Sequence, residues 1–342
     1  MKAKFEPVFN HKRKPLYEIL PLDTPMAFGI SASQACNINC EYCLHSLSPE
    51  ELKKKNFICK NMDWDMFLKI VEQLKAFPKK IKSISVAGQG EPLCNPNLAK
   101  MIKALKEADV ADDVSYITNA LLFTRKRVEE VIDAGVDRIF ISLQGMTSKK
   151  YKEVCGREID FEAFYNVLKY LYEYSRNKCQ INIKIADVAL EEGDREKFLT
   201  RFGDICDKIH VETIKPLYAD VDYTNILGKN ITDMTTTRFG REHKKQKACY
   251  LSFYTLCVNP LGEIKPCGAP FQGCEGLGNI EDTTLVEAWN SDVRREFLLN
   301  MLKGNRCQND VCKDCDYPND VPSENDEIDP HAEELIQKFT KA

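Results

Sequence analysis

The sequence predicts an α/β fold in which an open, partial barrel of six strand-and-helix units precedes a small cysteine-rich domain. Short runs rich in β-branched and aromatic residues alternate with amphipathic stretches between residues 27 and 215. Such alternation is typical of parallel strands joined by crossover helices. Six units are too few to close the usual eight-stranded barrel, so the sheet should stay open, as a partial barrel or a doubly wound sheet.

The predicted strands share a short, apolar, β-rich composition. In chain order they are AFGISAS (27–33), SISVAG (83–88), DVSYITN (113–119), RIFISLQG (138–145), INIKIADVAL (181–190) and KIHVETIK (208–215). The clearest helices are WDMFLKIVEQLKAF (64–77) and FEAFYNVLKYLYEYS (161–175), whose apolar residues recur at helical spacing.

The rest of the chain divides into four segments around this predicted barrel at 27–215. Residues 1–26 form an N-terminal extension, and 216–245 lose the strand–helix rhythm, which indicates a linker or a substrate-covering segment. Residues 246–320 carry clustered cysteines and a hairpin pattern, TLCVNPLGEIKPC. Residues 321–342 are acidic and weakly helical, and we expect a tail there.

Composition excludes several classes of function. The chain has 342 residues and a formal net charge of −4, with no run of 18 apolar residues, so neither a nucleic-acid surface nor a membrane span is expected. The first residues lack a secretory signal pattern, which predicts a cytoplasmic location. Disulfides are rare in that compartment, so dense clusters among the 15 cysteines should bind metal or do chemistry.

Three cysteines, Cys36, Cys40 and Cys43, follow the first predicted strand. Zinc would need a fourth ligand, for which His45 is the available candidate. A four-iron cluster held by three thiolates leaves one iron open to a substrate or cofactor. The loop lies at the C-terminal end of a strand, where α/β folds build their active sites, so the second interpretation is favoured.

The spacing Cys36-x3-Cys40-x2-Cys43, with Tyr42 before the last cysteine, resembles the signature of the radical S-adenosylmethionine (SAM) superfamily. The resemblance implies a 4Fe–4S cluster that binds SAM. It also implies that Gly88, Gly90 and Glu91, after the second strand, contact the methionine amino group, and that Tyr42 belongs to the cofactor site. Glycine lets the backbone approach a ligand closely, and an acidic or backbone acceptor can pair with an ammonium group.

The same resemblance places ribose and carboxylate contacts at the third and fourth strand ends, where Asn119, Ser142 and Gln144 stand. Two positions depart from the family pattern. Ala120 replaces the usual glycine, and Gln144 stands where the family often has aspartate.

A second group of cysteines, Cys249, Cys267, Cys312 and Cys315, brackets the hairpin and ends in a Cys-x2-Cys pair. The arrangement is similar to the C-terminal module called SPASM in its full form and twitch in its short form. That similarity implies one auxiliary 4Fe–4S cluster, because no further cysteine follows Cys315. Zinc fits the spacing as well, and Cys257 and Cys307 are possible substitute ligands.

The resemblance implies cleavage of SAM to a 5′-deoxyadenosyl radical, which abstracts a hydrogen atom from a small-molecule substrate. It also implies a reducing electron donor such as flavodoxin or ferredoxin. The layout with one auxiliary cluster most resembles the aminocyclitol dehydrogenases, so we expect oxidation of a sugar- or cyclitol-like alcohol. The alternatives are an epimerase, with Cys155 as thiol hydrogen donor, a peptide- or protein-modifying radical enzyme, and an iron–sulfur electron carrier.

A catalytic base is expected on the fifth and sixth strands, where apolar and polar residues alternate. If the isoleucines of the fifth strand face the helices, Lys184 points into the barrel. The same alternation directs His210 and Glu212 inward. Any of the three could accept a proton, and a polar network that only fills the barrel is the alternative.

Overall fold

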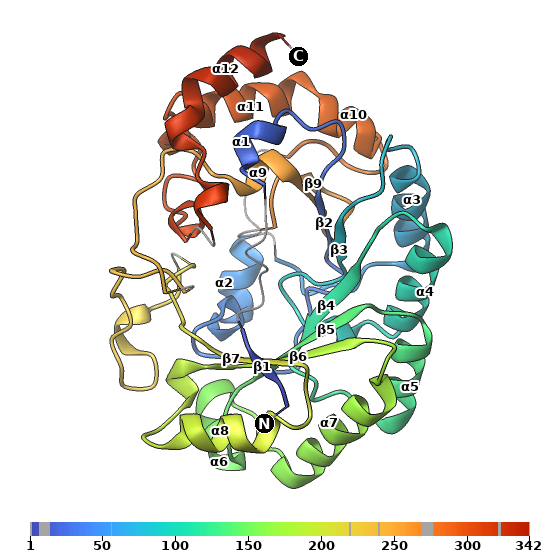
Figure 1. Ribbon diagram of the computed structural model, residues 1–342, viewed down its shortest axis with the longest axis vertical. Helices are drawn as coiled ribbons and strands as arrows, with labels where there is room; N and C mark the ends of the chain where they lie inside the picture. Colours follow the sequence, from blue (N-terminus) through green and yellow to red (C-terminus); the bar gives the residue numbers. More distant parts are fainter. Residues whose placement is uncertain are drawn as a thin grey trace.

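The computed structural model describes residues 2–6, 14–55, 57–218, 220–238, 240–268, 276–320 and 323–341. Within these residues one nine-stranded sheet has the order β1-β7-β6-β5-β4-β3-β2-β8-β9. Figure 1 shows the curved sheet with helices along its outer side. The sheet is not closed, so the expected partial barrel is confirmed.

All six predicted strands are present and run parallel as β2 to β7. The strands are β1 (Lys4–Phe5), β2 (Ala27–Ile30), β3 (Ser83–Ser85), β4 (Val114–Thr118), β5 (Arg138–Leu143), β6 (Gln180–Ala186), β7 (Lys208–Glu212), β8 (Thr255–Val258) and β9 (Ile264–Lys265). Each strand is shorter than its sequence pattern, because the polar residues that follow it turn into loops at the C-terminal edge.

Helices cover the outer face of this sheet (Figure 1). They are α3 (Trp64–Leu74), α4 (Leu98–Ala108), α5 (Arg125–Asp133), α6 (Ser148–Cys155), α7 (Phe161–Ser175) and α8 (Asp194–Phe202). Thr124, Thr147 and Asp160 begin three of them by accepting a hydrogen bond from a backbone N–H of the first turn. The core lies between helices and sheet, and Ile181 and Ile183 of β6 are fully buried in it.

The cysteine-rich C-terminal segment is joined to the barrel by its hairpin rather than standing apart from it. β8 pairs in parallel with β2, and β9 pairs antiparallel with β8. Gly262 makes the turn with a φ of +79°, a conformation that favours glycine. At the other edge β1 pairs with β7, so both edges of the six-stranded sheet are covered.

The residues predicted to form a tail include a packed helix, so this expectation was wrong. The C-terminal helices are α10 (Leu285–Asn290), α11 (Asp292–Leu302) and α12 (Ala332–Lys341). Leu335 and Phe339 of α12 are buried in a second core with α11, with the short helix α1 (Leu16–Ile19) and with α9 (Leu251–Tyr254). Their spacing of four residues places both on one face of the helix, and the acidic residues around them hid this signal.

The described residues between 216 and 245, expected to be a linker or a cover, form an irregular strap on the side of the curved sheet away from its helices, at the left of Figure 1. Tyr223 of this strap is buried, and its hydroxyl donates to the Tyr42 carbonyl (3.0 Å). The Leu227 N–H donates to the Glu41 carboxylate (2.9 Å). The strap is therefore attached to the cysteine loop by these two hydrogen bonds.

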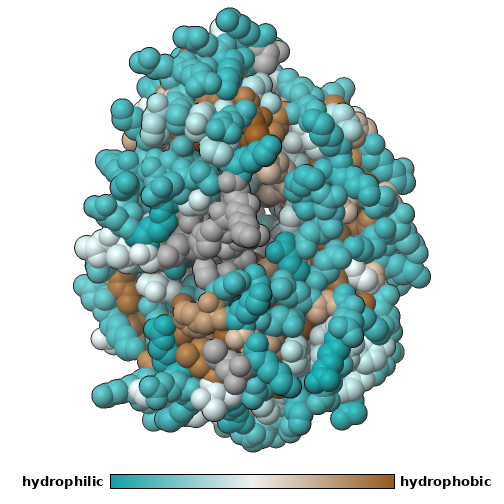
Figure 2. Space-filling view, in the orientation of Figure 1, coloured by the Kyte–Doolittle hydropathy of each residue, from teal (hydrophilic) through white to brown (hydrophobic). Residues whose placement is uncertain are grey.

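The face in Figure 2 is mostly hydrophilic, with small, separate hydrophobic patches. Among the described residues, no helix is both long and apolar enough to span a bilayer.

Candidate active site

The first three cysteines lie in the loop between β2 and the short helix α2 (Pro49–Lys54). Burial raises the pKa of the Cys36 thiol to about 12 and that of Cys40 well above its usual value. Thiolates buried in this way need positive charge nearby, which a bound metal cluster supplies. The donor set therefore fits an iron–sulfur cluster.

The cysteines lie close enough for the charge on each to influence the others, as the pKa of Cys40 responds to Cys36 and Cys43. Among the described residues, no three His, Cys, Asp or Glu side chains converge on a point that one ion could occupy. Cluster ligands need not converge in this way, because each cysteine binds a different iron.

The loop after β3, residues 87–91, lies directly against the cysteine loop. A Cβ on Gly90 would lie 2.5 Å from the Ala35 carbonyl oxygen and 2.6 Å from that of Ser33. A Cβ on Gly88 would lie 2.0 Å from the Ser31 hydroxyl oxygen. The resemblance implies that both glycines contact the cofactor. In the structure, Gly90 makes room for the backbone of residues 33–35, and Gly88 makes room for the Ser31 side chain.

Two hydrogen bonds hold these loops together. The Glu91 N–H donates to the Ala35 carbonyl (2.8 Å), and the buried His45 ring contacts the Gln89 carbonyl through Nε2 (2.6 Å). Burial lowers the pKa of His45, so the neutral ring donates this bond. This nitrogen is therefore committed to the protein, which disfavours His45 as a zinc ligand.

Glu91 is buried and joins the ends of β3 and β4. Its carboxylate accepts hydrogen bonds from the Thr118 hydroxyl (2.6 Å) and from the backbone N–H groups of Leu93 (3.0 Å) and Asn119 (2.7 Å). Burial raises its pKa, and these donors oppose the shift. Asn119 also donates to the Asn37 side chain in the cysteine loop (2.8 Å). Glu91 and Asn119, both predicted as cofactor contacts, thus connect the ends of β3 and β4 to the cysteine loop.

Ala120 has a left-handed backbone, with a φ of +62°, at the position where the sequence pattern would have glycine. An alanine there carries steric strain that glycine does not. We expect Ala120→Gly to raise the free energy of unfolding by about 0.5–1 kcal/mol, because relief of the strain exceeds the extra entropy of glycine in the unfolded chain. Thermal unfolding would test this. Ala104→Gly, inside helix α4, is the control and should destabilise the protein by about 1 kcal/mol.

The polar residues predicted on β6 and β7 form one cluster. Ser142, Lys184 and His210 lie in register on three neighbouring strands. The Lys184 ammonium is 2.5 Å from the Glu212 carboxylate, and these side chains are only 15% and 20% exposed. The three candidate bases are therefore brought together, as the strand alternation predicted.

The charges of this cluster differ. Burial lowers the pKa of His210 to about 4, helped by the charge of Lys184, so its imidazole is neutral at pH 7. Burial opposes ionisation of Glu212, but Lys184 and Arg238 outweigh it, and the pKa of Glu212 lies below its usual value. At neutral pH the cluster thus offers a carboxylate and a neutral imidazole as proton acceptors.

Tyr42 connects the cysteine loop to this cluster. Its hydroxyl donates to the Gln144 side chain, whose amide donates to the Ser142 carbonyl (3.2 Å). The pKa of Tyr42 is raised by burial and then by the charges of Cys40 and Glu212, so the phenol lies near both. Tyr42, Ser142 and Gln144 are thus neighbours, as the resemblance implied.

Cys155 lies at the end of α6, in the helix layer. Its thiol is buried and donates to the Tyr151 carbonyl of the same helix (3.0 Å), while its own carbonyl accepts from Asn39 of the cysteine loop (3.1 Å). This contact supports the loop. It does not present the thiol to the cluster of Lys184 and Glu212, so the geometry does not favour Cys155 as a hydrogen donor.

The auxiliary cysteines also come together. The pKa of Cys249 is raised by burial and then by the charges of Cys267, Cys315 and Cys312, so the four thiols are neighbours. Of the substitute ligands, Cys257 lies on β8, where burial raises the pKa of its thiol and the neighbouring Cys267 adds to this shift.

Cys307 is exposed, unlike the four thiols of the auxiliary group. Two residues that sequence reasoning missed shape the loop of Cys312 and Cys315. Arg306 donates to both cysteine carbonyls, and the Asn309 side chain accepts from the Cys312 N–H (3.1 Å). Both come just before a Cys-x2-Cys pair, which is the only signal the sequence carried.

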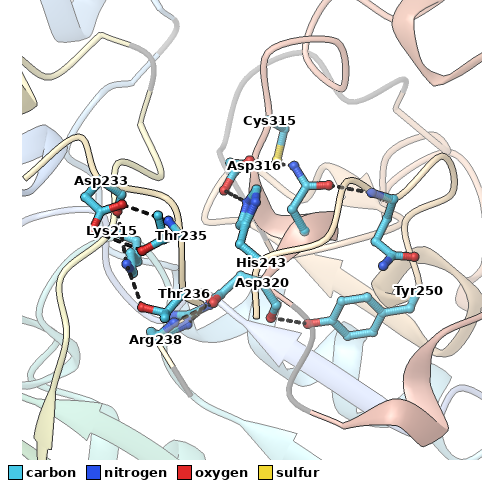
Figure 3. A network of polar contacts seen from close by, with 12 residues as sticks. Lys215, Asp233, Thr235, Thr236, Arg238, His243, Tyr250, Cys315, Asp316 and Asp320 are labelled. Atoms are coloured by element: carbon cyan, nitrogen blue, oxygen red, sulfur yellow. Dashed lines mark hydrogen bonds and ion pairs between the residues drawn. The ribbon is translucent and has the colours of Figure 1, made fainter. Parts of the chain in front are cut away.

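A polar network ties the strap to the loop after Cys315 (Figure 3). Arg238 forms an ion pair with the buried Asp320, which also accepts from the Arg238 N–H (2.8 Å). The His243 ring contacts the Asp316 carboxylate (3.3 Å). These residues were also missed, because nothing in the sequence pairs a strap residue with one about 80 positions later.

Tyr317 lies where the strap, the auxiliary loop and the barrel cluster meet. The Arg238 guanidinium lies over its ring, 5.2 Å from the centroid. Its backbone N–H donates to the Cys315 sulfur. Burial raises the pKa of its phenol, and the charge of Glu212 adds to this shift. One residue thus links the auxiliary cysteines to the Lys184–Glu212 pair.

Comparison with known families gives two matches. Residues 30–187 match the model of the Radical SAM superfamily, and residues 249–316 match that of an iron–sulfur cluster-binding domain, SPASM. The first match contains Cys36, Cys40 and Cys43, and the second runs from Cys249 to just beyond Cys315.

Similar proteins differ in what they do. A probable GTP 3′,8-cyclase of Methanococcus vannielii is 27% identical over 248 residues, which cover 71% of this chain and 78% of that protein. A tungsten-containing aldehyde ferredoxin oxidoreductase cofactor-modifying protein of Pyrococcus furiosus is 26% identical over 159 residues. That match covers 46% of this chain and 42% of the relative, less than half of each.

Two solved structures share the fold. SuiB of Streptococcus suis bound to SAM superposes with a TM-score of 0.62 at 19% identity, covering 89% of this chain and 74% of SuiB. BtrN in complex with AdoMet and 2-DOIA gives a TM-score of 0.54 at 19% identity, covering 85% of this chain and 92% of BtrN.

Proposed function

From a chain that carries a radical SAM domain followed by a SPASM domain, we propose an oxidoreductase that dehydrogenates an alcohol of a small sugar- or cyclitol-like substrate. The two domains bind SAM with a 4Fe–4S cluster and an auxiliary iron–sulfur cluster. Cys36, Cys40 and Cys43 would hold the first cluster, and Cys249, Cys267, Cys312 and Cys315 the second. A cytoplasmic flavodoxin or ferredoxin would supply electrons.

The observation that carries this proposal is the charge balance of the residues between the two cysteine groups. Lys184 is paired with Glu212, and Arg238 with Asp320. Each of these two cations thus has its own carboxylate, which reduces the positive charge that they offer to a phosphate or carboxylate group. The buried Lys215 nearby donates to the Asp233 carbonyl (3.1 Å). Such a lining suits an uncharged substrate with several hydroxyl groups.

Aromatic hydroxyls complete this region. Burial raises the pKa of the phenols of Tyr42, Tyr317 and Tyr218. The charge of Glu212 adds to this shift at Tyr42 and Tyr317, and Tyr317 and Cys43 add to it at Tyr218, so these groups are neighbours. Rings with a polar tip offer a sugar both an apolar face and a hydrogen-bonding group. We propose that Tyr218 and Tyr317 bind the substrate, while Tyr42 stays with the cofactor site.

When bound, the first cluster supplies the electron that cleaves SAM to a hydrogen-abstracting radical, and the auxiliary cluster supplies the acceptor for the electron that the substrate releases. Glu212 accepts the hydroxyl proton as the carbonyl group forms. Lys184 holds this carboxylate ionised and in place. His210, neutral beside Lys184, can take the proton onward.

The test is single-turnover chemistry on anaerobically reconstituted protein with a panel of cyclitols and amino sugars that includes 2-DOIA, the compound bound to BtrN. With a substrate deuterated at the reacting carbon, dehydrogenation predicts deuterium in 5′-deoxyadenosine and a product lighter by the two hydrogens lost. An isomer in which that deuterium has been replaced by hydrogen from solvent would identify an epimerase. Absence of SAM cleavage would contradict the radical mechanism and favour an iron–sulfur electron carrier.

A second candidate function is supported by sequence similarity. The probable GTP 3′,8-cyclase of Methanococcus vannielii matches over most of both chains. GTP is therefore a required member of the substrate panel. A triphosphate demands excess positive charge, so the paired Lys184 and Arg238 argue against it, and we expect no GTP-dependent product.

A further inference from the structure

Arg306 is a buried cation at the auxiliary cysteines. Its side chain is 6% exposed, and one terminal nitrogen, Nη1, donates to the carbonyls of both Cys312 (2.6 Å) and Cys315 (2.8 Å). The guanidinium thus reaches across the Cys-x2-Cys loop that it precedes. Its charge also acts on the Cys315 sulfur, where it favours the thiolate.

Within the described part of the chain, no carboxylate forms an ion pair with Arg306, although 28 other pairs are formed there. A buried cation without a partner is costly, and carbonyl dipoles compensate it only in part. Cys312 and Cys315, beside Arg306, would be anionic as thiolates on a cluster.

A second buried arginine shows how the protein treats such a charge elsewhere. Arg294 is also 6% exposed, but its guanidinium lies 3.4 Å from the centroid of the Trp289 ring. It also donates to the carbonyls of Trp289, Ser252 and Phe253. Arg294 is therefore stabilised by an aromatic face, whereas the described residues give Arg306 no aromatic partner.

A cluster ligated by four thiolates is anionic and becomes more so when it takes up an electron. A fixed positive charge nearby stabilises the reduced form more than the oxidised form. Net charge and hydrogen bonding around a cluster are among the factors that set its reduction potential.

We propose that Arg306 is a positioning residue whose charge is balanced by the thiolate-ligated auxiliary cluster and raises the reduction potential of that cluster, making it a better electron acceptor. The inference rests on the proposed function in one respect, that the auxiliary cluster receives an electron from the substrate. In that step the substrate is oxidised by one electron, its hydroxyl proton goes to Glu212, and the cluster is reduced by one electron.

The experiment is an anaerobic redox titration followed by electron paramagnetic resonance in the Cys36/Cys40/Cys43 triple-alanine background, in which only the auxiliary cluster remains. We expect Arg306→Gln, which keeps an N–H donor but loses the charge, to shift the potential to more negative values. Arg306→Lys, which keeps the charge, should stay near the parent value. Arg201→Gln is the control, because Arg201 lies on α8 and pairs with Glu162.

A reduction potential of Arg306→Gln equal to that of the parent would overturn the proposal. Arg306 would then only hold the loop of Cys312 and Cys315 in place. If Arg306→Gln does not load iron, Arg306→Lys decides. An Arg306→Lys variant that loads iron and has a near-parent potential supports the proposed role of the charge. A failure of this variant to load, or a potential as negative as expected for the glutamine variant, overturns the proposal. The titration needs no substrate, so a failed substrate search and an unchanged potential are separate results.

Discussion

Replacing Gly90 by alanine is expected to abolish loading of the first iron–sulfur cluster and, with it, cleavage of SAM. The new Cβ would lie 2.5 to 2.6 Å from backbone atoms of Ser33, Gln34 and Ala35. Backbone on all these sides cannot turn away as a flexible side chain would, so the loop carrying Cys36 must move. Overpacking of this kind costs about 1–3 kcal/mol in stability, but displacement of the cysteines should cost the cluster itself.

Iron and sulfide content, with 5′-deoxyadenosine formation, would measure this effect. Gly276→Ala is the matched control, because no atom of the described residues lies within 4 Å of a Cβ built there. The auxiliary cluster should remain in both variants, so iron content in Gly90→Ala should fall by about half rather than to zero. Full cluster loading in Gly90→Ala would contradict the assigned role of this glycine and return it to a direct contact with SAM.

Periodic patterns made much of this fold readable from the sequence. The alternation along residues 181–185 predicted which face of β6 meets the helices, and the observed pair of Lys184 and Glu212 follows from it. The strand pattern that precedes Cys36 likewise predicted that the cysteine loop follows the end of a strand. Local rules suffice here because the side chains of a strand take their faces from its own alternation.

Contacts between distant segments were not readable. Nothing in TLCVNPLGEIKPC says that its first strand pairs with β2, because a parallel pairing of this kind depends on the exposed edge of another element. Arg238 and Asp320 are 82 residues apart, and each is an ordinary charged residue within its own segment. The packing of Gly90 against residues 33–35 was not readable either, because close approach by a backbone and by a ligand leave the same glycine in the sequence.

The Glu212→Gln variant is expected to lose substrate oxidation by about 100-fold or more while SAM cleavage without substrate continues. The Glu212 carboxylate is ionised and lies near Tyr42, and an amide cannot take the hydroxyl proton. The change also leaves the Lys184 ammonium without its partner in a buried setting, which should destabilise the fold by about 3 kcal/mol.

Those two effects must be separated, because an unstable protein is also inactive. The Lys184→Met/Glu212→Gln double variant removes both charges, so it should regain much of the lost stability without regaining turnover. Thermal unfolding reports the first quantity, and the yield of oxidised product per 5′-deoxyadenosine reports the second. Activity restored in the double variant would mean that Glu212 only balances Lys184. In that case His210, held neutral by burial and placed on the same strand as Glu212, would be the group that receives the proton.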